Sequence, residues 1–71
     1  MFEGKSRTEI ENAIDEWIVC CSNAERNRGI MKRRFIDGCT YERIAEEYDL
    51  SVVQTKNIVY SMKKLLEVHN V

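Results

Sequence analysis

The sequence repeats a helix-start signal and contains no proline. Each signal is a Ser or Thr followed three residues later by Glu or Gln. This is the pattern of a capping box, in which each side chain bonds the other residue's backbone N–H. The signals lie at 8–11, 22–25 and 51–54. Strand signals are weak, because apolar and polar residues do not alternate strictly beyond a few positions. The pattern therefore predicts an all-α fold.

Apolar residues recur at helical spacing after the first two signals and define two predicted helices. The first helix is expected over 8–21, with Thr8 as its cap. Trp17 lies on its apolar stripe and is expected to anchor this helix to the rest of the domain. The second helix is expected over 23–37, with Ser22 as its cap. We therefore expect the N-terminal half of the chain to be a pair of helices.

Two glycines mark the second predicted helix. Gly29 lies inside it and is expected to weaken it by about 1 kcal/mol relative to Ala. Gly38 follows the last apolar position, which is the usual place for a glycine that ends a helix. The helix is therefore expected to stop just before Gly38.

The last two predicted helices are separated by a short turn. A helix over 41–48, capped by Thr40, precedes a longer helix over 52–67, capped by Ser51. The helix-turn-helix layout consists of a helix of about two turns, a connection of three to four residues and a longer helix. Ala45 supplies the small side chain needed where two helices cross closely. The expected architecture is a small four-helix domain that contains a helix-turn-helix.

Length and hydropathy place this fold in a single domain. The chain has 71 residues, of which 44% are hydrophobic and 32% are charged, so one domain over 1–71 with a small core is expected. No apolar run approaches the roughly 20 residues of a membrane span. The start, Met-Phe-Glu-Gly-Lys, has no apolar signal core. We expect a cytoplasmic protein without a membrane partner.

Catalytic and metal-binding patterns are weak in this sequence. The possible soft ligands are Cys20, Cys21, Cys39 and His69, and they lack the paired Cys-x-x-Cys spacing of a structural zinc site. We expect reduced thiols and no metal. No nucleophile–base pair or phosphate-binding loop is evident. The expectation is a protein that is not an enzyme and uses no cofactor or small-molecule substrate.

The segment 33–51, RRFIDGCTYERIAEEYDLS, resembles the C-terminal promoter-recognition domain of bacterial sigma factors. It is also similar to small sigma-like proteins encoded by phages and prophages of Gram-positive bacteria. The motif is a basic, aromatic helix end with Gly, then Thr-Tyr-Glu-x-Ile-Ala-Glu-Glu, a turn and Leu-Ser-Val. The resemblance covers about 24–67. It implies a small transcription regulator that binds duplex DNA through the helix-turn-helix.

Two positions depart from the family pattern. Asp49 stands where the family usually has Gly in the turn, and it is expected to adopt the left-handed conformation at some cost. Thr55 stands where the family prefers an aliphatic core residue. The sigma domain that binds core polymerase most strongly is absent, so we do not expect a complete sigma factor.

The outer side of the helix over 52–67 carries the candidate DNA contacts. It is the side opposite the apolar stripe at 100° per residue, and it would enter a major groove. Asn57 and Gln54 are expected to pair with adenine, and Val53 to touch a thymine methyl. The candidate base contacts are Val53, Gln54, Lys56 and Asn57. The candidate phosphate contacts are Ser51, Tyr60, Lys63, Lys64, Arg33, Arg34 and Arg43. Tyr41 and Tyr48 are expected in the core.

Acidic and basic residues are separated along the chain. This separation leaves two interpretations open. Residues 1–25 carry two basic and six acidic side chains, whereas 26–43 carry six basic and two acidic ones. The basic residues are placed either to grip a DNA backbone or to pair with the acidic first helix. The alternative function is a protein-interaction module that docks on RNA polymerase or another regulator without independent DNA binding.

The net charge bears on the form that would bind DNA. A net charge of −1 predicts weak non-specific binding, which favours a homodimer or a polymerase-bound form over a free monomer. Val19 lies opposite the apolar stripe of the first helix and is a weak sign of self-association. Double-stranded DNA, RNA polymerase and a second copy of the chain are therefore the candidate partners.

Overall fold

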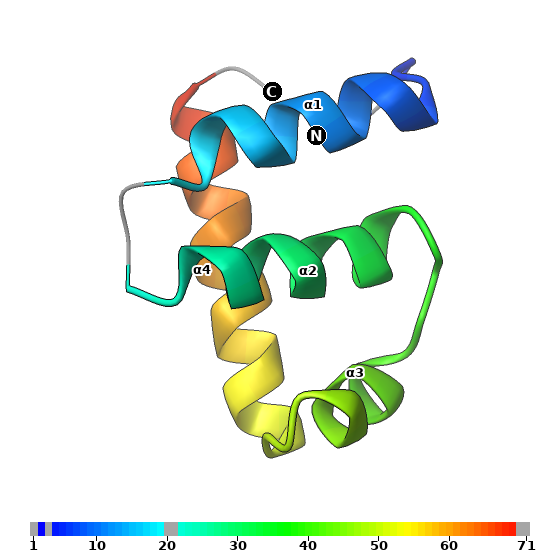
Figure 1. Cartoon of the computed structure of the whole chain (residues 1–71), viewed down its shortest axis with the longest axis vertical. Coiled ribbons are helices and arrows are strands. Elements are labelled where there is room, and N and C mark those ends of the chain that lie inside the picture. Colours follow the sequence, from blue (N-terminus) through cyan, green and yellow to red (C-terminus); the bar gives the residue numbers. More distant parts are fainter. Residues whose placement is uncertain (1, 3, 20–21, 70–71) are drawn as a thin grey trace.

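The chain forms four α-helices and no strand within the residues that the structure, a computed structural model, describes (Figure 1). The described residues are 2, 4–19 and 22–69, so the expectations for Cys20 and Cys21 lie outside them. The helices are α1 (Arg7–Trp17), α2 (Ala24–Phe35), α3 (Tyr41–Glu47) and α4 (Val52–Val68). The predicted all-α fold is confirmed. None of the described helices is long and apolar enough to cross a membrane.

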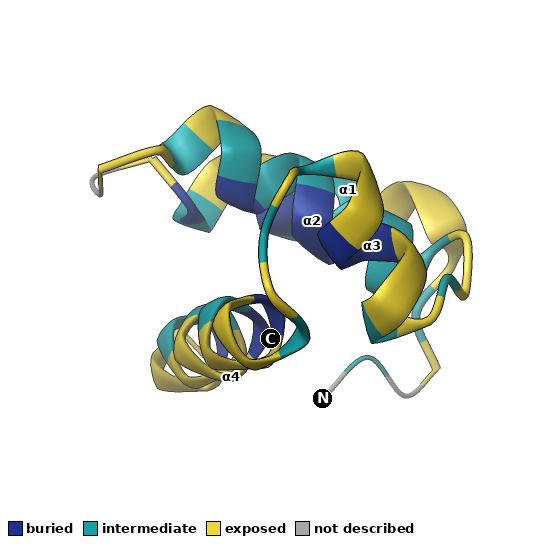
Figure 2. Cartoon of the chain, turned by 90° about the horizontal axis from the view of Figure 1, so that it is seen from below, coloured by how far each residue is buried: buried dark blue, intermediate teal, exposed yellow. Residues whose placement is uncertain are grey.

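Helix α4 packs against each of the other three helices, which lie together on one side of it. Figure 1 shows α1 near the C-terminal end of α4, α3 near its N-terminal end and α2 between them. Seen nearly end-on in Figure 2, α4 has its buried residues toward that layer and its exposed residues on the opposite side. One long face of α4 is therefore left uncovered by the described chain.

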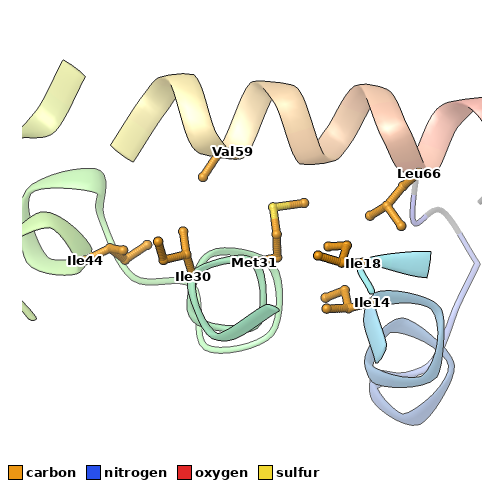
Figure 3. Close-up of a cluster of buried hydrophobic side chains, with 7 residues drawn as sticks. All are labelled: Ile14, Ile18, Ile30, Met31, Ile44, Val59 and Leu66. Carbon is orange, nitrogen blue, oxygen red and sulfur yellow. The ribbon is translucent and has the colours of Figure 1, made fainter. Parts of the chain in front are cut away.

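A single cluster of buried apolar side chains joins the four helices. In Figure 3, Val59 of α4 points toward Ile30, with Ile44 beside Ile30, and Leu66 of α4 points toward Ile18, with Ile14 beside Ile18. The side chain of Met31 lies between these two groups. All seven residues are almost completely buried, and they are Ile14, Ile18, Ile30, Met31, Ile44, Val59 and Leu66. The core therefore follows the inner stripe of α4 from Val59 to Leu66.

Helix α1 begins earlier than predicted, because Ser6 and not Thr8 is its cap. The Ser6 hydroxyl accepts from the Glu9 N–H at 3.3 Å, and a Glu9 carboxylate oxygen accepts from the Ser6 N–H at 3.3 Å. The sequence contains both boxes. The earlier one adds backbone hydrogen bonds to the helix, and Ser6 has the extended backbone of a cap (φ −75°, ψ 167°). The predicted cap at Thr8 is wrong, and this residue lies inside α1.

Helix α1 also ends earlier, at Trp17 and not at residue 21. Ile18 leaves the helix and is completely buried, and its carbonyl accepts from Nη1 of Arg28 at 2.7 Å. Trp17 is only half-buried and stacks on His69 with ring centroids 3.9 Å apart. Trp17 thus packs at the edge of the core and ties α1 to the end of α4, as predicted, whereas Ile14 and Ile18 fill the interior.

Helix α2 begins at Ala24 without the predicted capping box. Its cap is Asn23, which has φ 58° and makes no side-chain cap hydrogen bond. Asparagine tolerates this left-handed conformation better than most residues, and the turn that it makes leaves Ser22 outside the helix. The predicted cap at Ser22 is therefore wrong. The helix ends at Phe35, two residues before the predicted end, and Gly38 beyond it has φ 72°, where glycine is favoured.

The predicted starts of α3 and α4 are confirmed. The Thr40 hydroxyl accepts from the Arg43 N–H at 3.2 Å. The Ser51 hydroxyl accepts from the Gln54 N–H at 3.0 Å, and Oε1 of Gln54 accepts from the Ser51 N–H at 2.9 Å. These side chains satisfy N–H groups that have no partner inside the helices. Each helix ends within one residue of its predicted end.

The turn between α3 and α4 depends on Asp49 and Leu50. Asp49 has φ 55°, so it adopts the predicted left-handed conformation. This is the position where the family that the segment resembles usually has glycine. The Leu50 N–H donates to the carbonyl of Ala45 at 2.8 Å, which closes the end of α3. Ala45 itself is buried, as its expected place between the helices requires. Hydrogen bonds therefore define the path from α3 into α4.

Candidate nucleic-acid interface

The outer face of α4 is the candidate site. Val53 and Tyr60 are 67% and 56% exposed, and Lys56 and Asn57 between them are also exposed. On the opposite face Thr55, Val59 and Leu66 are buried. The predicted division of this helix into an inner and an outer side is confirmed. Exposed apolar and amide groups next to lysines can contact base edges and phosphates together.

Two side chains at the start of α4 are already hydrogen-bonded. These two predicted contacts, Ser51 and Gln54, form the capping box. Because Oε1 of Gln54 accepts from the Ser51 N–H, the side chain is folded back along the helix, with its NH₂ group free to donate. Asn57 makes no side-chain hydrogen bond to another described residue. Asn57 therefore has both its donor and its acceptor free for the bidentate adenine contact, whereas Gln54 does not.

The basic residues differ in whether they contact a carboxylate. Four of them have a carboxylate oxygen within 4.0 Å, and these are Arg7, Arg28, Lys32 and Arg33. Among the described residues, no such oxygen lies near five of the predicted contact residues, Arg34, Arg43, Lys56, Lys63 and Lys64. The paired group holds α1, α2 and α3 together. The second group lies on α2, α3 and α4.

Arg33 is occupied by acidic partners. Its Nε donates to Oε1 of Glu47 at 2.9 Å, its Nη2 donates to the other carboxylate oxygen, and its Nη1 donates to Asp37 at 3.1 Å. The hydrogen bonds from Arg33 lower the pKa of Glu47, and those to Glu47 and Asp37 raise the pKa of Arg33. The structure thus places Arg33 in contacts with its own chain, apart from the other predicted phosphate contacts.

Tyr41 packs against the core, as predicted, and also borders the candidate site. The residue is half-buried, and its ring lies 6.5 Å from that of Tyr60 between centroids, at an angle of 71°. The guanidinium carbon of Arg34 lies 4.3 Å from the Tyr41 ring centroid, and Nζ of Lys56 lies 5.7 Å from it. Because these residues come from three helices, no periodic pattern in the sequence could indicate their meeting.

A metal site needs several ligand side chains close together. No group of three or more His, Cys, Asp or Glu side chains among the described residues is arranged to hold a metal ion. Cys39 is a half-buried free thiol, and His69 is stacked on Trp17 at the C-terminal end of α4. The exposed groups of the candidate site offer hydrogen bonds and positive charge.

Comparisons with protein-family models, curated proteins and solved structures found no match to this chain. The interpretation of the site therefore depends on its own residues and geometry.

Proposed function

We propose that the chain binds duplex DNA and acts as a small, sigma-like transcription regulator in the cytoplasm. In this proposal α3 and α4 form a helix-turn-helix, and α4 enters the major groove with its outer face toward the bases. The observation that carries the proposal is the uncovered face of α4, along which amide and basic side chains have no acidic partner among the described residues.

The geometry supports a division of labour among the contact residues. Asn57 reads adenine through its free amide, Val53 touches a thymine methyl, and Lys56 contacts a guanine edge or the backbone. Gln54 donates through its NH₂ group alone, because its oxygen is used in the cap. The remaining phosphate contacts in the proposal are Ser51, Tyr60, Lys63, Lys64, Arg34 and Arg43. Arg33 is left out, since Glu47 and Asp37 occupy its donors.

The net charge of the chain bears on how tightly a single copy would bind DNA. With a net charge of −1, the whole molecule is not attracted to DNA, so affinity depends on the local basic group around α4. We therefore propose that the active form is a homodimer or a complex with RNA polymerase, in which further contacts add to those of one α4.

A selection from random duplexes tests this function. The purified chain is used alone and with core RNA polymerase, and we expect an enriched motif that contains an adenine. Asn57→Ala should relax the preference at that adenine. Asn12→Ala, on the exposed surface of α1, is the matched control and should leave the motif unchanged. A motif that is equally enriched by Asn57→Ala, or no motif under either condition, would contradict the proposal.

A further inference from the structure

Four side chains from three helices meet beside the outer face of α4. They are Arg34 of α2, Tyr41 of α3, and Lys56 and Tyr60 of α4, and we call them the Tyr41 cluster. We propose that this cluster binds the phosphodiester backbone of DNA next to the base pairs that α4 contacts. The inference rests on the proposed function and gives Tyr41, which was expected only in the core, the role of a positioning residue.

Arg34 is held in place before any ligand arrives. Its Nη1 donates to the carbonyl of Cys39 at 3.0 Å, and its guanidinium carbon lies 4.3 Å from the centroid of the Tyr41 ring. Nε and Nη2 make no hydrogen bond to another described residue. A guanidinium fixed in this way loses little side-chain entropy on binding, and its free N–H groups match the oxygens of a phosphate.

The charge of the cluster is not balanced by the described residues. Lys56 lies 5.7 Å from the same ring centroid, so two positive groups approach one aromatic ring. No carboxylate oxygen of a described residue lies within 4.0 Å of either group, whereas Arg33, the sequence neighbour of Arg34, has two acidic partners. Like charges near one ring repel each other, and a bound anion relieves that repulsion.

The location of the cluster favours DNA as the source of this anion. Lys56 and Tyr60 lie on the outer face of α4, and Asn57 follows Lys56 on the same face. A duplex read by that face must bring one of its backbones past the flank of the helix. Tyr60, 56% exposed, can add its hydroxyl to the donors of Arg34 and Lys56. One ligand therefore satisfies the base-contacting face and the cluster together.

The test is the salt dependence of affinity for one duplex, measured with the wild-type chain, Arg34→Met and Lys56→Met. Each substitution should reduce the slope of log K against log salt by about one and weaken binding about eightfold at 0.1 M salt. Arg7→Gln removes an equal charge from an exposed site on α1 and should leave the slope unchanged. Unchanged slopes in both cluster variants would overturn the inference and leave the proposed function standing.

Two variants of Tyr41 test its positioning role. Tyr41→Phe keeps the ring under Arg34 and should bind DNA like the wild type. Tyr41→Leu removes the ring and should reproduce the reduced slope of Arg34→Met, with circular dichroism showing that the helices remain. A wild-type slope in a folded Tyr41→Leu would contradict this role.

Inorganic phosphate separates the inference from the proposed function. In NMR titrations it should shift the Arg34 Nε–H and Tyr60 ring signals of the wild type, and Arg34→Met should abolish the Tyr60 shift. If the wild type binds no duplex, the proposed function fails. In that case shifts with phosphate would still support an anion site for another phosphate ligand, and no shifts would overturn the site as well.

Discussion

Arg33, near the end of α2, donates hydrogen bonds to both carboxylate oxygens of Glu47, the last residue of α3. The same guanidinium donates to Asp37, whose carboxylate also lies 3.7 Å from Arg7 at the start of α1. The pair between Arg33 and Glu47 joins the two helices that support the N-terminal half of α4. Arg33 therefore helps to set the position of α3 relative to α2.

The pair between Arg33 and Glu47 should make stability depend on pH. Hydrogen bonds from Arg33 lower the pKa of Glu47 below its usual 4.5, so the folded state favours the carboxylate. A lowered pKa in the folded state contributes stability above the unfolded pKa, and this contribution is lost as pH falls through the folded value. Thermal unfolding between pH 7 and pH 2.5 should show a smaller acid-side decrease in melting temperature for Glu47→Gln than for the wild type.

The neighbouring Glu46 provides the control. It is exposed and has no basic group within 4.0 Å among the described residues. Glu46→Gln should therefore keep the acid-side decrease of the wild type. Parallel pH profiles for the wild type and Glu47→Gln would contradict the role of this pair.

Local sequence signals were sufficient where one signal had no competitor. Thr40 and the box of Ser51 and Gln54 each stand alone before an apolar stripe, and they predicted the starts of α3 and α4. Before α1 the boxes of Ser6 and Thr8 overlap, and only the whole helix decides between them. At α2 the chain makes a left-handed turn at Asn23, and the capping box of Ser22 and Glu25 does not form. Local patterns fail where the path of the chain between helices determines the start.

The candidate site, too, could be predicted only in part from the sequence. The period of 3.6 residues was enough to predict the outer face of α4, because exposure there depends on one helix. The Tyr41 cluster and the pair between Arg33 and Glu47 combine side chains from different helices. Which of two adjacent arginines meets a carboxylate and which meets an aromatic ring depends on how α2 and α3 pack. No spacing within one helix contains that information.

A glycine should be needed at position 29 because the side chain of Tyr48 lies against it. This steric requirement is separate from the weakening of α2 that the sequence predicts for a glycine. A Cβ at position 29 would overlap the Tyr48 hydroxyl, so this side chain must move when Gly29 is replaced. Ala is favoured in a helix by about 1 kcal/mol, and overpacking typically costs about 1–3 kcal/mol. We expect Gly29→Ala to lower the free energy of unfolding by about 1 kcal/mol, measured by urea denaturation.

Removing the Tyr48 hydroxyl should reverse the loss of stability caused by Gly29→Ala. In a Tyr48→Phe background the closest remaining ring atom lies 3.4 Å from the added Cβ, which is close but tolerable. Gly29→Ala should then become neutral or stabilising, with a coupling energy of about 1–2 kcal/mol in the double-mutant cycle. Equal effects of Gly29→Ala in both backgrounds would contradict the steric explanation.

Thr55 should contribute to stability through its methyl group more than through its hydroxyl. It is completely buried, and its Oγ1 donates to the Ser51 carbonyl at 3.0 Å. That carbonyl also accepts from the Thr55 N–H at 3.0 Å, so Thr55→Val leaves it with a partner. Thr55→Val should change stability by less than about 0.5 kcal/mol, whereas Thr55→Ser should cost about 1 kcal/mol. A larger loss in Thr55→Val than in Thr55→Ser would contradict this prediction.

Gln54 has two roles that substitution can separate, the capping of α4 and the proposed contact with DNA. Its oxygen accepts from the Ser51 N–H at 2.9 Å, and its NH₂ group is the part left for a ligand. Gln54→Glu keeps an oxygen for the cap and puts a negative charge at the positive end of the helix, so stability should be unchanged or slightly higher. Gln54→Ala loses the cap bond and should cost about 0.5–1 kcal/mol.

DNA binding should rank these two variants in the opposite order. Gln54→Glu removes the donor and places a carboxylate against the phosphates, so its affinity for a selected duplex should fall at least tenfold, or about 1.4 kcal/mol. Gln54→Ala loses only the donor and should bind more tightly than Gln54→Glu despite its lower melting temperature. Parallel loss of stability and affinity across the two variants would mean that Gln54 acts only through the cap, and that the first turn of α4 does not face DNA.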